Sequence, residues 1–427
     1  MARVLIDGYN MGLTKGTGVA TYGRNLCREA SELGYDVSVL YGQCFANSGD
    51  PLAREIAFFD SPEKKQGKVG EALRLGKQAM LGPTGHSPRE VEMSGKVISR
   101  TFASRLPQAR RFYNSSDLFQ ASSASFALWS NLSTVRMPDS HDLAHWTYPL
   151  PLRTAGCPNI YTLHDLVPLR LPYTTLDNKK RYYNLLKRIT ATADHIVTVS
   201  ECSRRDIIDL LDVSEDRITN TYQSVQLPSE MLENDEEYLA REVEGATGVG
   251  YKEYFLFWGS IEPKKNIDRM IEAYLASGVQ TSLVIVGAQA WKAKEQLRLL
   301  MNDSVRHNSR IIQLSYTPLA MLISLIRGAR AALFPSLYEG FGLPALEAML
   351  VGTPVICSNT ASLPEVAGDA ALLVDPYDTR AIAAAIRQID ADRDLRTELT
   401  RRGLDQAKLF SPSEYRERLD KLYRQVI

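Results

Sequence analysis

Two carboxylates stand eight positions apart around a turn in residues 334–348. Glu339 precedes Gly340 and Gly342, and Glu347 falls about one turn into the helix that we expect to follow. Glycine lets a backbone approach a ligand closely, and the amides in the first turn of a helix point toward anions. A turn with both features suits a ligand that carries a phosphate and hydroxyl groups, as a nucleotide sugar does. The ordinary alternative is that the two glutamates only cap or solvate the helix.

Two adjacent lysines offer the positive charge that such a ligand requires. Lys264 and Lys265 follow the apolar run 254–258, which predicts a buried strand, and Ser260 lies between this run and the lysines. Because ligands bind at the carboxyl ends of parallel strands, we expect a cation beside the predicted phosphate site. Lysine pairs are usually just solvated, so the pair alone does not establish the site.

A histidine is expected at another strand end. Residues 161–163 lead directly into His164 and Asp165. We expect His164 to hydrogen-bond a sugar or an acceptor, and Asp165 to orient its ring. His145 follows an earlier strand-like segment and is expected to support the site without touching the ligand. On its own, a histidine at a strand end is more often structural than catalytic.

Alternating strand-like and helix-like segments predict the elements that position these residues. Their order is that of an α/β protein with doubly wound parallel sheets, and 427 residues favour two domains. Gly18 belongs to a glycine loop after the first predicted strand, where ligands bind in such sheets, although the loop lacks the GxGxxG spacing. We place the first domain at residues 1–225, a linker at 226–252 and the second domain at 253–410. Residues 411–427 predict a final helix.

Composition and charge restrict the class of protein. Apolar residues make up 44% of the chain, and no apolar run approaches the roughly 20 residues that a spanning helix needs. The chain begins with strand-like residues and not with a secretory signal, so we expect a cytoplasmic location. The balance of 50 basic and 50 acidic residues argues against a nucleic-acid partner. Five scattered cysteines without metal-ligand spacing fit reduced thiols.

A basic segment interrupts the first domain. Residues 45–135 have the character of an insertion, and residues 62–111 hold eleven Lys or Arg against four Glu. A solvent-exposed segment on the protein surface would account for this composition. The functional alternative is peripheral contact with a membrane, in which residues 62–111 dock on anionic lipid headgroups or on a pyrophosphate-linked acceptor at the inner face of the plasma membrane.

The motifs at these positions resemble those of the family 4 glycosyltransferases, which are retaining enzymes with the GT-B fold of two Rossmann-like domains facing a cleft. The motifs are HDL at 164–166, GSIEPKKN at 259–266, EGFGLPALE at 339–347, GTPVI at 352–356 and LPEVAG at 363–368. The resemblance covers the chain apart from about residues 45–135. It implies acceptor binding by the first domain, nucleotide-sugar binding by the second, and a final helix that crosses back to the first.

The resemblance also implies a role for each site residue. His164, Glu339 and Lys265 are the predicted catalytic residues: Glu339 contacts hydroxyls of the transferred sugar, and Lys265 contacts the diphosphate. Glu347 hydrogen-bonds the ribose. The predicted donor-binding residues are Gly18, Ser260, Lys264, Lys265, Gly340, Phe341, Gly342, Leu343 and Glu347. Most family members carry arginine at the position of Ser260, so Lys264 is expected to replace that contact. No metal ion or cofactor is expected.

The motifs look most like the branch that builds bacterial surface polysaccharides such as lipopolysaccharide. That branch implies GDP-mannose as donor, with other GDP- or dTDP-deoxysugars as rivals, and a glycan or lipid-linked acceptor. Two other functions stay open, a noncatalytic GT-B scaffold or binding subunit and a nucleotide-sugar epimerase. A phosphorylase that uses pyridoxal phosphate would need a longer chain. Hydrolysis of a nucleotide sugar separates an enzyme from a scaffold.

Overall fold

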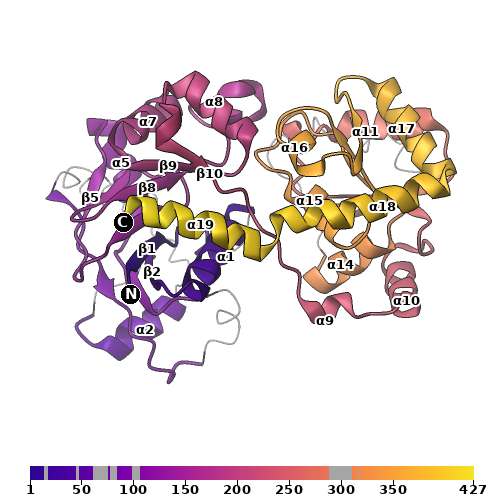
Figure 1. The fold of residues 1–427 in the computed structure, drawn as a ribbon. Coiled ribbons are helices and arrows are strands. Elements are labelled where there is room, and N and C mark those ends of the chain that lie inside the picture. The colour runs from indigo at the N-terminus through magenta and orange to yellow at the C-terminus, as the bar shows by residue number, and fades with distance from the viewer. Residues whose placement is uncertain are drawn as a thin grey trace.

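The computed structural model describes residues 1–13, 18–44, 48–60, 76, 84–98, 106–287, 310–315 and 317–427. These residues form two α/β domains that lie side by side in Figure 1. Most of the predicted docking patch at residues 62–111 lies outside the described residues. In the part of the chain that the structure describes, no helix has both the length and the apolar character to cross a membrane.

The first domain is built on a sheet in which every pair is parallel except β3 with β4. Across the sheet the strands are β10 (Ile218–Asn220), β9 (His195–Thr198), β8 (Asn159–Thr162), β6 (Leu143–Trp146), β1 (Arg3–Asp7), β2 (Asp36–Tyr41), β4 (Arg111–Asn114) and β3 (Arg89–Glu90). The central strands are buried along their whole length, and they combine apolar residues with buried polar ones such as Ser38, His145 and Thr162. The strand order reverses between β1 and β6, so the carboxyl ends of these two strands flank a topological switch point.

Helices and a small second sheet complete this domain. The helices are α1 (Gly18–Glu32), α2 (Pro51–Phe59), α5 (Leu118–Trp129), α6 (Val167–Arg170), α7 (Lys179–Thr192) and α8 (Glu201–Leu211), and the small sheet pairs β5 (Ser133–Val135) with β7 (Leu152–Thr154). Ser200 caps α8, because its Oγ accepts a hydrogen bond from the Ser203 amide at 3.0 Å.

The second domain is built on an entirely parallel sheet. Its strands, in spatial order, are β13 (Ile311–Leu314), β12 (Ser282–Val286), β11 (Tyr254–Trp258), β14 (Ala331–Phe334), β15 (Val355–Ser358) and β16 (Ala371–Val374). The described helices of this half are α9 (Ser229–Leu232), α10 (Glu236–Thr247), α11 (Ile267–Ser277), α14 (Leu319–Gly328), α15 (Leu343–Leu350), α16 (Leu363–Ala367), α17 (Thr379–Ala391) and α18 (Arg393–Ala407). The switch point lies between β11 and β14, and ligands bind beyond the carboxyl ends of such strands.

The linker is shorter than the predicted residues 226–252. Helix α10 contacts α14 of the second domain and buries Leu239 and Val243, which stand four positions apart on one helix face. The acidic residues that suggested a linker include Glu236 and Glu237, which occupy the first turn of α10, where negative charge favours a helix. Residues 236–247 therefore belong to the second domain.

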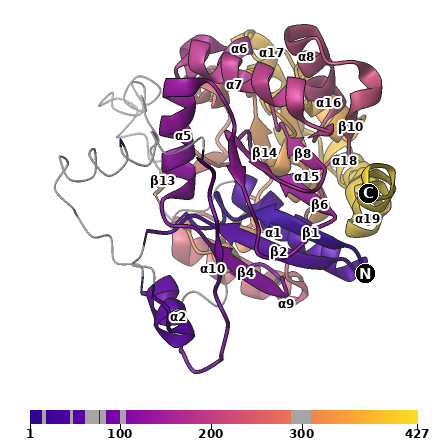
Figure 2. The same cartoon turned by 90° about the vertical axis from the view of Figure 1, so that its left-hand side faces the viewer.

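The last helix, α19 (Pro412–Val426), returns to the first domain, and Figures 1 and 2 show the C-terminus lying there near the N-terminus. The Tyr423 hydroxyl hydrogen-bonds His145 Nδ1 at 2.8 Å. Tyr35 donates a hydrogen bond to Asp420 at 3.0 Å. Helix α19 thus ties the end of the second half of the chain to α1 and β6.

Shortening Leu419 of α19 to alanine is expected to destabilise the protein. The side chain is fully buried, and a Leu→Ala change at such a site costs about 2 to 5 kcal/mol of unfolding free energy. The midpoint of thermal unfolding should therefore fall clearly. Leu404→Ala on α18, where the leucine is 43% exposed, is the matched control and should change it little. If the two variants have the same midpoint of thermal unfolding, Leu419 is not packed in the core as described.

Candidate functional site

The lysine loop and the glutamate turn meet at the switch point of the second sheet. The loop after β11 contains a 3-10 turn, Pro263–Lys265, and the turn after β14 carries Glu339. Lys265 Nζ lies 2.6 Å from Glu339 Oε1, and only 12% and 11% of these side chains are exposed. The Leu337 amide donates to the Lys264 carbonyl at 2.7 Å. The carboxyl ends of β11 and β14 therefore present a largely buried ion pair.

The charges at this site favour an ionised glutamate between lysines. Burial alone would raise the pKa of Glu339, but Lys265 and Lys264 outweigh it, and the pKa is lowered. The Ser336 hydroxyl donates a second hydrogen bond to the same oxygen at 2.8 Å. Burial opposes the charge of Lys264, but Asp165, Glu339 and nearby Glu262 raise its pKa well above the ordinary value. Lys264 therefore stays charged beside the ion pair that Lys265 forms with Glu339.

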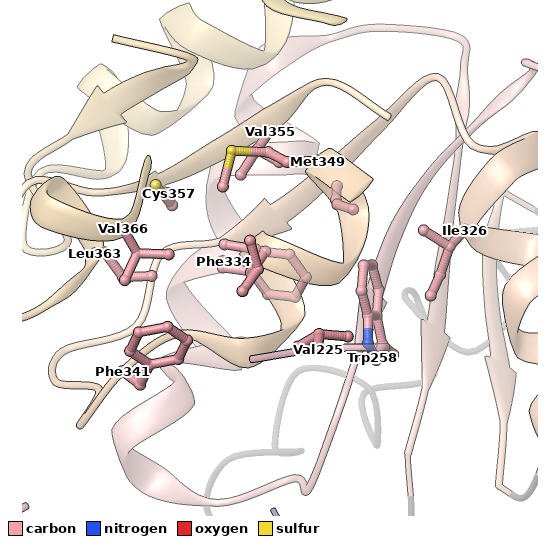
Figure 3. Packing of buried hydrophobic residues seen from close by; sticks show 14 of the residues in the cluster. Val225, Trp258, Ile326, Phe334, Phe341, Met349, Val355, Cys357, Leu363 and Val366 are labelled. Atoms are coloured by element: carbon pink, nitrogen blue, oxygen red, sulfur yellow. The ribbon is translucent and has the colours of Figure 1, made fainter. Parts of the chain in front are cut away.

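The turn that carries Glu339 is held by hydrogen bonds to its backbone. The Ser362 hydroxyl lies 2.8 Å from the Glu339 carbonyl and 2.7 Å from the Phe341 carbonyl. Gly342 has a φ of 114°, and a Cβ there would lie 2.8 Å from Leu363 Cδ2. Figure 3 shows Phe341 beside Leu363 in the apolar cluster that supports the turn. Both the backbone angle and the available space therefore require glycine at position 342.

Helix α15 starts at Leu343, immediately after this turn. The Leu343 and Ala345 amides in its first turn have no acceptor within the helix and can bind an anion, whereas Pro344 has no N–H. Glu347, one turn further on, accepts a hydrogen bond from Trp258 Nε1 at 2.9 Å. Burial raises the pKa of Glu347 to about 7, although Trp258 and Lys265 oppose the shift. Trp258, the last residue of β11, was not predicted as a site residue.

His164 is oriented by a backbone carbonyl. Its Nε2 lies 2.9 Å from the Thr147 carbonyl, which can only accept, so Nε2 carries the proton and Nδ1 is an acceptor. Burial lowers the pKa of His164, although Thr147 and Asp165 raise it in part, so the ring is neutral at pH 7. The buried Asp7 carboxylate accepts a hydrogen bond from the Thr147 amide and so helps to hold Thr147 in place. Sequence reasoning missed both Asp7 and Thr147, although a carboxylate that ends an apolar strand is a visible signal.

The prediction that Asp165 orients the His164 ring is wrong. Asp165 Oδ1 accepts from the Val167 amide at 3.1 Å, at the start of α6. A ring nitrogen of His164 is bound by the Thr147 carbonyl instead. Asp165 acts on the site through its charge, because it raises the pKa of Lys264.

His145 supports the fold more than the site. Its two ring nitrogens hydrogen-bond the Thr162 and Tyr423 hydroxyls, each at 2.8 Å, and burial lowers its pKa to about 3. A chain of contacts leads from it to His164 through Thr162 and Tyr22, whose ring lies edge-on to the His164 ring at 4.7 Å, and the charge of His164 adds to the lowering of its pKa. The predicted supporting role is therefore indirect, and the residue mainly joins β6 and β8 to α19.

The two domains touch at Gly340. A Cβ at this position would lie 2.9 Å from Asp165 Cβ and 2.9 Å from the His164 carbonyl oxygen. A Cβ at Gly18, the first residue of α1, would lie 3.5 Å from Leu343 Cδ1. The structure therefore brings His164, Asp165 and Gly18 of the first domain against the glutamate turn. The predicted residue Ser260 is exposed and lies two residues after the end of β11.

Two further contacts hold the domains together. The Glu365 carboxylate of α16 accepts hydrogen bonds from the amides of Glu201 and Cys202, at 2.9 and 3.1 Å, in the first turn of α8. A carboxylate at a helix N-terminus is favoured by the helix dipole. The Tyr338 hydroxyl donates to Asp206 of α8. The LPEVAG motif thus contains an interdomain contact that sequence reasoning did not assign.

Two aspartates outside the site, Asp390 and Asp392, have structural partners. Asp390 pairs with Arg330 and accepts from the Thr281 hydroxyl at 2.6 Å, and Asp392 caps α18 through the Leu395 amide at 2.9 Å. Among the described residues, no group of three or more His, Cys, Asp or Glu side chains is arranged to hold a metal ion.

Two sequence families match the chain. The family described as Glycosyltransferase Family 4 matches residues 16–226, and the family described as Glycosyl transferases group 1 matches residues 246–406. Together the two matches cover most of both domains.

Curated proteins with similar sequences include mannosyltransferases of O-antigen synthesis. O-antigen chain mannosyltransferase B of Escherichia coli is 37% identical over 263 residues, which are 59% of this chain and 66% of the relative. O-antigen chain mannosyltransferase RfbU of Salmonella typhimurium is 29% identical, over 58% of this chain and 63% of the relative. Serotype-specific mannosyltransferase WbdA of E. coli is 28% identical, over 62% of this chain and 33% of the relative. The chain therefore spans less than two thirds of the length of these relatives.

Solved structures confirm the predicted GT-B fold. Sucrose-phosphate synthase from Thermosynechococcus elongatus aligns with a TM-score of 0.67 at 18% identity, over 100% of this chain and 99% of that one. Anabaena HepE in complex with UDP and glucose aligns with a TM-score of 0.66 at 12% identity, over 100% of both chains.

Removing the Glu365 carboxylate is expected to loosen the domain contact. In Glu365→Ala the two α8 amides lose a charged acceptor, and such hydrogen bonds are worth about 1.5 to 3 kcal/mol. The radius of gyration measured by small-angle X-ray scattering should increase, and the thermal midpoint should fall. Glu244→Ala, an exposed glutamate on α10, is the control. If the two variants scatter alike, Glu365 does not hold the domains.

Proposed function

The chain belongs to glycosyltransferase family 4, and on this premise we propose that it transfers a hexose, with retention, from a nucleotide sugar to a glycan or lipid-linked acceptor. The observation that supports this most directly is the pairing of Lys265 with Glu339 at the switch point of the second sheet. His164 of the first domain lies against the same turn. The mannosyltransferases among the relatives favour GDP-mannose as donor.

In this proposal the main electrostatic task is to stabilise the leaving diphosphate. Negative charge develops there as the bond to the sugar breaks, and fixed positive groups lower the barrier. Lys264, Lys265 and the first-turn amides of α15 supply this charge. The Glu339 carboxylate holds Lys265 in place and accepts hydrogen bonds from sugar hydroxyls, while Glu347 binds the ribose. These groups can act without a metal ion.

His164 serves the sugar side of the reaction. Its neutral ring leaves Nδ1 as an acceptor for a hydroxyl of the transferred sugar or of the acceptor. In the proposed retaining reaction, the bond from C1 to the phosphate oxygen breaks and the acceptor oxygen bonds to C1 from the same face. The acceptor proton passes to the departing diphosphate. Closure of the two domains over C1 keeps water out of this step.

The proposed pathway is the synthesis of a bacterial surface polysaccharide. Its early steps use nucleotide sugars, which places the proposed enzyme in the cytoplasm. The excess of basic residues in 62–111 supports peripheral contact with the inner face of the plasma membrane.

A screen for donor hydrolysis tests the proposed activity. Purified protein is incubated with GDP-mannose, GDP-fucose, UDP-glucose, UDP-GlcNAc and dTDP-rhamnose without added metal, and thermal shifts are recorded in parallel. We expect one donor, GDP-mannose, to stabilise the protein and to be hydrolysed slowly. Lys265→Ala and Glu339→Gln should each lower the rate by about 100- to 1,000-fold, since each removes a preorganised group.

Lys421→Ala, an exposed lysine on α19, is the matched control and should keep the wild-type rate. If no donor binds or reacts, the noncatalytic scaffold is the better interpretation. If a donor is hydrolysed at the wild-type rate by both site variants, the active site lies elsewhere.

Donor binding should weaken as the pH falls through the pKa of Glu347, which is about 7. Above this pH the ionised carboxylate accepts hydrogen bonds from the ribose hydroxyls, and below it the protonated group accepts them poorly. The KM for the donor should therefore rise by about tenfold from pH 8 to pH 6. In Glu347→Gln, KM should be higher and nearly independent of pH. The same pH profile in wild type and variant would exclude Glu347 as its cause.

A further inference from the structure

A hollow of about 360 Å³ lies in the second domain, at the amino ends of three neighbouring strands. Lys252, two residues before β11, and Arg330 and Pro354, one residue before β14 and β15, line it. These strands are parallel, and the Lys265–Glu339 pair lies beyond the carboxyl ends of two of them. Since a four-residue strand spans about 13 Å, the hollow is separate from the proposed donor site.

The lining of the hollow is basic. Four of its side chains are cations, namely Lys252, Arg330, Arg393 and Arg396, and none of the described residues that line it is acidic. The two arginines of α18 stand three positions apart, and residues at this spacing are neighbours on a helix face. Positive charge thus converges on the hollow from two strand starts and from one face of α18.

Nearby carboxylates neutralise only part of this charge. Asp390 pairs with Arg330. Burial lowers the pKa of Lys252 to about 8, and Arg396 adds to this shift while Glu236 opposes it. Burial and Arg330 also lower the pKa of Arg396, against the charge of Asp390. The cations therefore repel one another, and an anion in the hollow would relieve this repulsion.

Backbone carbonyls hold two of the cations and leave N–H groups for a ligand. Arg396 Nη1 donates to two carbonyls at the end of α17, at 2.7 and 2.8 Å. Lys252 Nζ donates to two carbonyls at the end of α14, at 2.6 and 3.0 Å. Lysine has three N–H donors and arginine five, so both side chains keep unused donors. The Arg393 guanidinium forms no hydrogen bond or ion pair with any other described residue.

A small phosphate monoester matches this hollow in charge and size. Its phosphate carries up to about two negative charges at pH 7 and accepts hydrogen bonds through three oxygens, and guanidinium groups bind phosphate through paired N–H bonds. The volume lies within the range of small-molecule pockets, about 300 to 1,000 Å³, which leaves room for an organic group beside the phosphate. A nucleic acid would need a stripe of basic residues, whereas these cations gather in one hollow.

We propose that this hollow binds a small phosphate monoester, such as a sugar phosphate, at a site distinct from the donor site. The proposal goes beyond the transferase function and does not depend on it.

Calorimetry with the full-length protein tests the site. The probes are inorganic phosphate, glycerol 3-phosphate and mannose 6-phosphate. Vesicles of phosphatidylcholine with phosphatidic acid, in a separate sedimentation assay, present the same monoester on a lipid surface. We expect at least one soluble phosphate compound to bind. Arg393→Gln and Arg396→Gln should each weaken this binding by about tenfold, since each removes a charged hydrogen-bond donor.

Two control variants accompany this titration. Arg401→Gln changes another arginine of α18, whose side chain is 63% exposed and does not line the hollow, and it should bind like wild type. Lys265→Ala removes a cation from the donor site and should also keep the binding.

The outcomes separate this site from the proposed function. Arg393 is exposed, so its variant reports on the hollow even if Arg396→Gln fails to fold. Binding that weakens in Arg393→Gln and persists in Lys265→Ala supports the site, even if no nucleotide sugar is hydrolysed and the transferase proposal fails. Three results overturn the site even where donor hydrolysis persists: only the vesicles or no probe binds, binding is unchanged in Arg393→Gln, or binding is lost in Lys265→Ala.

Discussion

The two domains meet where a glycine lets two backbones touch. At Gly340 there is no room for a Cβ, because the Asp165 side chain and the His164 carbonyl lie 2.9 Å from the place it would occupy. This close approach sets the carboxyl end of β14 against the carboxyl end of β8. The Glu365 carboxylate at the start of α8 holds the same arrangement from the side. Without these contacts, His164 of the first domain and the Lys265–Glu339 pair of the second domain would not lie in one site.

The arrangement of charge follows from burial. Placing Lys265 and Glu339 in a largely dehydrated site costs free energy, which their pairing and the Ser336 hydrogen bond offset. Such a pair adds little to stability, but it fixes the position of a cation. Lys264 keeps its charge because several carboxylates surround it. Preorganised positive charge beside the unpaired amides of α15 is the property that a leaving diphosphate requires.

The donor half of the site could be predicted from sequence because its residues lie in two continuous segments, the loop after β11 and the turn and helix after β14, whose motifs resemble those of the family. Glu339, Glu347 and Lys265 needed only the strand, the turn and the helix around them. The orientation of His164 could not be predicted, because it depends on Thr147, whose amide is held by Asp7, 140 residues away. The extent of the linker was misjudged because the apolar face of α10 consists mainly of two residues, Leu239 and Val243, in an acidic segment.

A single site built by both domains is the central claim, and the Gly340→Ala variant tests it most directly. The added methyl group should separate the domain edges while leaving the second domain intact. We expect calorimetry to show GDP binding close to wild type, while the turnover of GDP-mannose falls by about 100-fold, since displacements near 1 Å have effects of that size. Unchanged turnover would show that the reaction does not require His164 and the glutamate turn to be in contact.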